Sequence, residues 1–123
     1  HELRKAAQAL LSGCSALNQF FDKLEPWQKI KSEDPAEQML CAKAIERCIA
    51  HFDLLSRRLA PFCPRSATQL TKMLGDAASD DTSWGSDEVN EVLAAGTELG
   101  TAEVLFAKID NDAIAAEIEK LKE

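Results

Sequence analysis

Two long stretches of this sequence, residues 2–24 and 35–59, carry apolar side chains at steps of three and four. This spacing places the side chains on one face of an α-helix. Two such helices joined by a short connection favour an antiparallel helical bundle, so we expect an all-α fold. The expected inward-facing residues are Leu3, Ala7, Leu10, Cys14, Leu17 and Phe21 on the first helix, and Ala42, Ile45, Ile49, Phe52, Leu55 and Leu59 on the second.

Two prolines mark the connection between these helices. Pro26 disfavours helical backbone angles in the residue before it, so the first helix should end near Leu24. Ser32 or Asp34 can cap the second helix, because a short polar side chain accepts hydrogen bonds from the N–H groups of a first turn. Pro35 then occupies the first helical position, where its missing N–H is not needed.

A third, shorter helix is expected after the prolines at positions 61 and 64. Leu70, Met73 and Leu74 should face inward, and Gly75 stands where a helix commonly ends in a residue with positive φ.

The last part of the chain is more irregular. Residues 76–88 are mostly polar and typical of a solvated loop, and a short helix could end near Gly96. An extended apolar segment follows, after which Asp110 or Asp112 should cap a final helix. We expect this tail to wrap back onto the bundle.

The chain divides into two parts of different charge. Residues 1–75 hold 11 Lys or Arg against 8 Asp or Glu, whereas residues 76–123 hold 3 against 13. We expect both parts to belong to one domain, the first as the core of the helical bundle and the second as an acidic loop with a C-terminal fold-back segment and final helix. An anionic ligand should contact the first part, since it alone is net positive.

Several classes of protein are disfavoured. Charged residues interrupt every apolar run before the roughly 18 residues that a membrane span needs, and no signal peptide is evident, so we expect a cytoplasmic protein without a membrane partner, an organelle being the alternative. The four cysteines form no CxxC pair, which argues against a disulfide framework. Cys41, Cys48 and His51 have helical spacing, but the ligand spacing of a metal site is absent, so buried cysteines and no metal are expected.

Catalytic motifs are also lacking. The sequence contains no phosphate-binding glycine loop, no G-x-S-x-G and no His-x-x-x-His pair. His51 is expected to be a half-buried helix residue, with an acid or base role as the less favoured alternative. We therefore expect no catalytic residue in this chain.

The remaining candidate is a recognition surface around Trp27. Lys23, Lys29 and Lys31 are near it in sequence, and an aromatic plane flanked by cations suits an unstacked base and its phosphates. The alternatives are that the lysines belong to a solvated helix face and that Trp27 is a core residue, which composition alone favours because Trp is highly buried on average.

Three separated segments resemble methionyl-tRNA synthetases, which are class I aminoacyl-tRNA synthetases. "LNQFFDKLEPWQKIKSEDP" resembles the stretch in which a helix with an Asn-Gln-aromatic pattern leads to a Pro-Trp step and a Lys-containing turn. "RRLAPFCPRSATQLTKMLG" is similar to the family's "LxPFxPxxAxxLxxxLG", and "AAGTELGTAEVLFAKIDNDAIAAEIEKLK" to its closing segment. Together, and in this order, the segments cover almost the whole chain, which makes the resemblance specific.

The resemblance implies the α-helical anticodon-binding domain and a C-terminal peptide that folds back towards the catalytic domain. It implies that Trp27 stacks on an anticodon base of methionine tRNA, with Pro26 fixing the backbone that presents the ring. Asn18 matches the family's helix Asn and is expected to support the loop before Trp27, by a hydrogen bond. Lys29, Lys31 and Arg47 are the expected phosphate-binding residues.

The chain also departs from the family pattern. The HIGH and KMSKS signatures of the catalytic domain are absent, so ATP and methionine are expected to bind elsewhere in a parent methionine-tRNA ligase and no cofactor is expected here. The preceding helix, which in the family supplies an Asn and an Arg for reading the anticodon, is absent too. The pair Phe20-Phe21 stands where the family usually has one aromatic and one aliphatic residue.

One alternative function remains open at this point. The helical scaffold could serve as a protein-interaction module, with the acidic second part binding a basic protein partner through its final helix. That role would not require Trp27 to be exposed. A stand-alone enzyme of another class is the least favoured alternative.

Overall fold

The computed structural model describes residues 2–78 and 94–122, and every regular element in these ranges is helical. The elements are α1 (Glu2–Leu24), α2 (Pro26–Lys29), α3 (Pro35–Leu59), α4 (Pro64–Leu74), the 3₁₀ turn η1 (Gly75–Ala77) and α5 (Asn111–Lys120). The prediction of an all-α fold is confirmed. The loop expected around residues 76–88 and the short helix expected before Gly96 fall largely outside the described residues.

Local signals set the helix boundaries as expected. Helix α1 ends at Leu24, and α3 begins at Pro35, with the Asp34 side chain accepting a hydrogen bond from the N–H of Ala36 at 2.9 Å. Asp34, and not Ser32, is therefore the cap of α3. The sequence did not predict α2, a single helical turn that begins at Pro26 and ends before Pro35.

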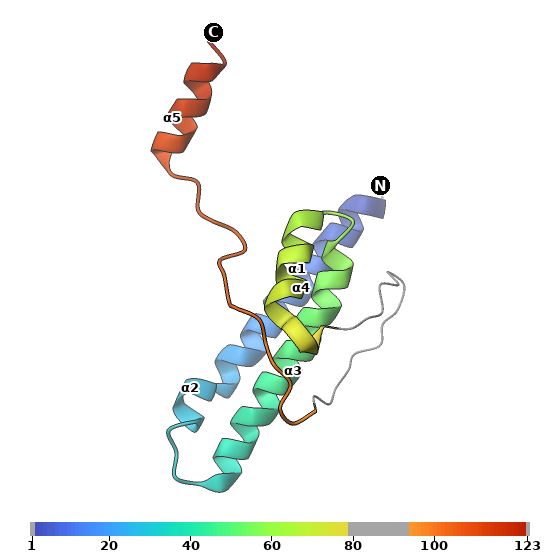
Figure 1. Cartoon of the computed structure of the whole chain (residues 1–123), viewed down its shortest axis with the longest axis vertical. Coiled ribbons are helices and arrows are strands. Elements are labelled where there is room, and N and C mark those ends of the chain that lie inside the picture. Colours follow the sequence, from blue (N-terminus) through green and yellow to red (C-terminus); the bar gives the residue numbers. More distant parts are fainter. Residues whose placement is uncertain (1, 79–93, 123) are drawn as a thin grey trace.

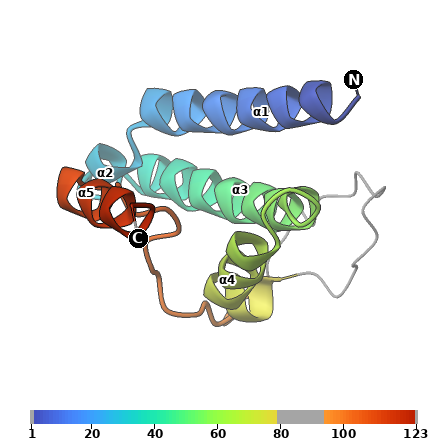
Figure 2. The same ribbon diagram turned by 90° about the horizontal axis from the view of Figure 1, so that it is seen from above.

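Helix α3 is the central element of the bundle. It contacts α1, α2, α4 and η1, and it runs lengthwise beside α1 (Figure 1). Seen from above, α1, α3 and α4 form successive levels, and α1 and α3 run side by side over most of their length (Figure 2). The two long helices are antiparallel neighbours, as predicted.

The expected core face of α3 is met only in part, because Ile49, Leu55 and Leu59 are half-buried but Ala42, Ile45 and Phe52 are exposed. Its buried residues are small or polar (Cys41, Ala44, Cys48, Ala50, Asp53 and Ser56), whereas Ile45 and Phe52 are exposed. The reason is that α3 packs against neighbours on two sides, and small side chains let those helices approach closely. The larger apolar side chains lie at the flanks of these contacts.

On α1 the expected face is the more covered one: Ala7, Leu10, Cys14, Leu17 and Phe21 are half-buried, although no residue of the helix is fully buried and Leu3 is 74% exposed. Its main contact with the bundle is with α3. In α4 the prediction is confirmed for Leu70 and Leu74, which are buried, and Met73 is half-buried.

The residues after the gap fold back onto α4. The N–H of Asp76 donates to the carbonyl of Glu98 at 2.9 Å, and the N–H of Gly100 donates to the carbonyl of Met73 at 3.0 Å. Gln69 adds a side-chain hydrogen bond to Glu103 at 2.9 Å. We call residues 97–103 the clamp segment. The expected return of the chain to the bundle is therefore seen for residues 97–103.

Beyond the clamp segment the chain leaves the bundle. Asp110 caps α5 by accepting from the N–H of Ala113 at 2.8 Å, as predicted for one of two candidate caps. None of the residues of α5 is buried, and the helix stands apart from the other helices (Figure 1). Among the described helices, none is both long and apolar enough to cross a membrane.

Candidate nucleic-acid interface

The corner between α1 and α2 controls how Trp27 is presented. Glu25 adopts left-handed backbone angles, with φ 44° and ψ 54°, and its N–H bonds to the carbonyls of Phe21 and Asp22 at 3.2 and 3.3 Å. Pro26 follows as the buried first residue of α2, where its ring fixes φ for a helical start. The chain therefore stops one helix and starts another within two residues.

Trp27 projects from this corner and is 45% exposed. Tryptophan is highly buried on average, so this exposure argues against the alternative in which Trp27 is a core residue. Its inner side faces Phe21, with ring centroids 5.8 Å apart and the planes tilted by 52°. The exposed part of Trp27 is available for contact with another group.

The backbone beneath Trp27 is fixed from a second direction. The buried thiol of Cys41 on α3 donates to the carbonyl of Pro26, with sulfur and oxygen 3.4 Å apart. The same carbonyl accepts from the N–H of Ile30 at 3.0 Å. Neither the Phe21 contact nor the Cys41 contact was predicted from the sequence, which offers no signal for a contact between different helices.

The expected phosphate-binding cations separate into two places. Lys29 ends α2 and is half-buried, and Lys31 is exposed in the turn that follows, so both stay near Trp27 along the chain. Arg47 is exposed on α3 and lines a hollow of about 360 Å³ between α1 and α3, together with Lys43 and Phe20. Trp27 does not line this hollow.

Asn18 is exposed on α1. Within the described part of the chain its side chain makes no hydrogen bond to the loop before Trp27, so the expected supporting bond is not seen.

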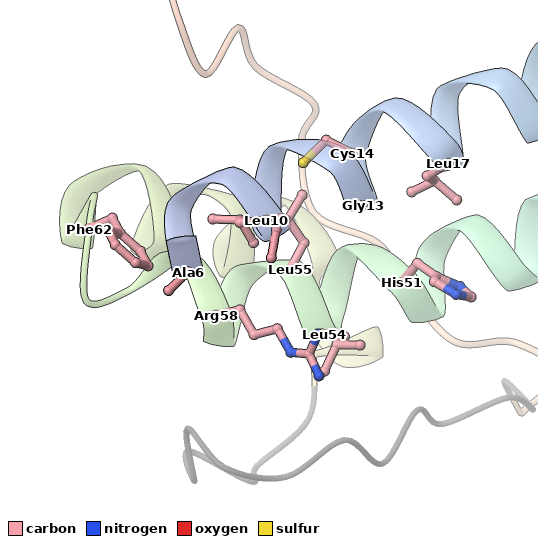
Figure 3. Close-up of a pocket in the computed structure, with 11 residues that line it drawn as sticks. Ala6, Leu10, Gly13, Cys14, Leu17, His51, Leu54, Leu55, Arg58 and Phe62 are labelled. Atoms are coloured by element: carbon pink, nitrogen blue, oxygen red, sulfur yellow. The ribbon is translucent and has the colours of Figure 1, made fainter. Parts of the chain in front are cut away.

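A larger apolar hollow of about 420 Å³ also lies between α1 and α3, nearer the start of α1. Figure 3 shows Leu10 of α1 and Leu55 of α3 between the two helices, with Arg58 at the edge. His51 lines both hollows and donates from Nδ1 to the carbonyl of Arg47 at 2.8 Å. It is exposed and not half-buried as predicted, because its position on α3 lies beside the contact with α1.

Buried groups elsewhere have structural roles. Cys41 and Cys48 are buried as expected, and burial raises the pKa of the Cys48 thiol. Asp53, only 3% exposed, pairs with Arg57 one turn later on α3 at 3.3 Å. In residues 2–78 and 94–122 no group of three or more His, Cys, Asp or Glu side chains is arranged to hold a metal ion.

Comparison with known proteins identifies a matching family and several similar proteins. Residues 1–122 match the family described as the anticodon binding domain of methionyl tRNA ligase. Similar proteins include methionine–tRNA ligases from Christiangramia forsetii, at 30% identity over 99% of this chain, and Methanosarcina acetivorans, at 31% over 98%. That of Cereibacter sphaeroides is 34% identical over 90% of the chain.

These relatives are much longer than the chain, which spans only 16% to 18% of their length. The match is therefore to one region of the ligases. Because the family pattern extends over nearly every residue and the fold is the expected helical bundle, the chain belongs to the family of methionyl-tRNA ligase anticodon-binding domains.

Proposed function

We propose that this chain binds the anticodon loop of methionine tRNA as a non-catalytic part of a methionine-tRNA ligase that works in the cytoplasm. The observation that supports this most strongly is the half-exposed Trp27 ring on the rigid corner formed by Glu25 and Pro26. In this proposal one unpaired base of the loop stacks on the free surface of the indole.

The residues around Trp27 have distinct roles in the proposal. Pro26 fixes the backbone, and Lys29 and Lys31 contact phosphates on either side of the stacked base. Arg47 contacts a more distant phosphate, since it lines a hollow that does not include Trp27. Asn18 is a further polar contact on the exposed surface of α1.

The proposal is tested by measuring affinity for methionine tRNA. Trp27→Ala should weaken binding by about 1–3 kcal/mol, or about 5- to 150-fold, because that is the usual contribution of one base–aromatic stack. Helix content should not change, since the ring is only partly covered. Trp84→Ala, which removes the other indole of the chain, is the matched control and should bind normally.

Two further measurements distinguish specific binding from simple charge attraction. Affinity should fall as salt is added, because lysine–phosphate contacts release counterions. A methionine tRNA with an altered anticodon should bind more weakly than the native one. Equal binding of both tRNAs, or of Trp27→Ala and the unchanged chain, would contradict the assignment.

The C-terminal segment supplies the second part of the proposal, a docking surface for the catalytic domain of the parent ligase. Val104 and Phe106 are exposed after the clamp segment, and α5 exposes Ile114, Ile118 and Leu121, the last at 86%. Apolar side chains in this number favour burial against another surface. In the parent, ATP and methionine would bind that catalytic domain.

The competing occupant of this segment is an unrelated basic protein, attracted by the acidic second part of the chain. Ile118→Asp should weaken binding of the separately produced catalytic domain, because it places a charge on the apolar face of α5. Glu117→Gln removes an exposed charge from the same helix and should have little effect. A larger loss of binding in Glu117→Gln than in Ile118→Asp would favour the basic partner.

A further inference from the structure

Phe21 contacts Trp27, and the proposed function assigns no role to this contact. Its ring lies 5.8 Å from that of Trp27 between centroids and is tilted by 52°, within the range that favours attraction between aromatic rings. The two residues belong to different helices, α1 and α2, on opposite sides of the Glu25 corner. A contact across a corner restricts a side chain more than one along a single helix does.

We propose that Phe21 is a positioning residue that holds the Trp27 ring at the orientation in which a base can stack on it. This inference rests on the proposed function, because it assigns how that site is kept ready. Phe21 itself need not touch the RNA.

The backbone contacts of this corner fix the main chain of α2 but do not fix the side chain of Trp27. Pro26 is buried, its carbonyl accepts from the Cys41 thiol at 3.4 Å, and the Ile30 N–H bonds to the same carbonyl. The main chain of α2 is therefore fixed against α3. These contacts do not fix the two side-chain torsions of Trp27, and nearly half of the residue is exposed. Among the described residues, the ring contact recorded for Trp27 is with Phe21.

A ring that rotates freely must be ordered when a base stacks on it, and that ordering weakens binding. Removing the constraint should therefore reduce affinity without removing the stack itself. We expect Phe21→Leu to weaken binding of methionine tRNA by about 3- to 10-fold, less than Trp27→Ala. Phe21→Tyr keeps the aromatic ring and should bind within about 2-fold of the unchanged chain.

Phe20 provides the matched control. It is the neighbouring residue on α1, also half-buried, but it lines the hollow between α1 and α3. Phe20→Leu makes the same chemical change at a residue for which no ring contact with Trp27 is seen among the described residues, so it is the control for motion of the Trp27 ring. Its tRNA affinity is not a control, because Phe20 lines the same hollow as Arg47.

The experiment uses the full chain carrying Trp84→Phe, so that Trp27 is its single source of indole fluorescence. Fluorescence anisotropy of Trp27 should fall in Phe21→Leu, because the ring gains motion, and should stay unchanged in Phe20→Leu. Circular dichroism establishes that each variant keeps its helices. If Phe21→Leu lowers helix content, Phe21→Met, closer in volume, replaces it.

A double-mutant cycle with Trp27→Ala decides whether Phe21 acts through Trp27. The inference requires the effect of Phe21→Leu to disappear when Trp27 is already Ala. A persistent effect, or unchanged affinity in Phe21→Leu while Trp27→Ala binds weakly, would overturn this inference alone. Normal binding by Trp27→Ala would instead overturn the proposed function.

Discussion

Gly100 is the position at which a single added methyl group should be most damaging. A Cβ atom built on Gly100 would come far inside contact distance of the Lys72 carbonyl oxygen and within 3.2 Å of the Met73 Cα. These are backbone atoms of α4, so they cannot move aside as the end of a side chain would. Gly100→Ala should therefore displace the clamp segment from α4.

Two estimates of the stability lost in Gly100→Ala agree. Forcing an extra carbon into a closely packed site typically costs about 1–3 kcal/mol. If the clamp segment detaches instead, the chain loses the backbone bonds from Asp76 to Glu98 and from Gly100 to Met73. At about 0.5–1.5 kcal/mol each, these bonds give about the same loss. We expect Gly100→Ala to lower the free energy of unfolding by about 1–3 kcal/mol.

Urea unfolding followed by circular dichroism measures this loss, and hydrogen exchange locates it. The Asp76 amide should exchange faster in Gly100→Ala, because its acceptor Glu98 belongs to the displaced segment. Gly13→Ala is the control, since a Cβ there meets nothing within 4 Å and replaces a glycine inside α1. It should raise stability by about 0.5–1 kcal/mol. Unchanged stability of Gly100→Ala with a protected Asp76 amide would refute this reasoning.

Three further predictions concern single positions, namely Asp34, Glu25 and Cys48. Asp34→Ala should lower the free energy of unfolding by about 1 kcal/mol, measured in urea, because the Ala36 N–H loses its acceptor. Glu25→Gly should raise it by about 0.5–1 kcal/mol, because relief of the left-handed backbone outweighs the added freedom of glycine when unfolded. For Cys48, burial raises the pKa, so above its ordinary value of 9.0 the unfolded state loses the thiol proton before the native state does. Stability should then fall with rising pH, and Cys48→Ala should lessen that fall, as urea titrations at pH 8 and 10 would show.

The helix boundaries could be predicted because they depend on nearby residues. Pro26 just after the end of α1, Pro35 at the first position of α3, and the aspartates before α3 and α5 act within one turn of the boundary they set. Gly75 has positive φ at the end of α4, as predicted, although its ψ of −127° leads into η1 and not into a left-handed cap. The clamp segment explains this, because its backbone passes directly over Gly75.

The buried face of α3 could not be predicted because it depends on which helices pack against it. Hydrophobic spacing identifies a helix that faces one neighbour, but α3 contacts α1, α2 and α4. The closest contacts then fall on small residues such as Ala44 and Cys48, not on the largest apolar ones.

In the candidate site, too, features set by nearby residues could be predicted, whereas features set by helix packing could not. The sequence, through its family resemblance, identifies Trp27 and the cations that follow it. It cannot show how far the ring is exposed, nor that Phe21 and Cys41 contact the corner, because these depend on how α1, α2 and α3 meet. Arg47 was grouped with Trp27 in the sequence, whereas the structure places it on a separate hollow.

The backbone of Glu25 connects stability with the proposed function. A non-glycine residue in the left-handed region costs about 1–2 kcal/mol, and such strain persists only where surrounding contacts outweigh it. Here those contacts are the burial of Pro26, the Cys41 hydrogen bond and the packing of α2 on α3. These contacts therefore hold the backbone of the corner in place, and the stacking of a base on Trp27 in the proposed function depends on that fixed backbone.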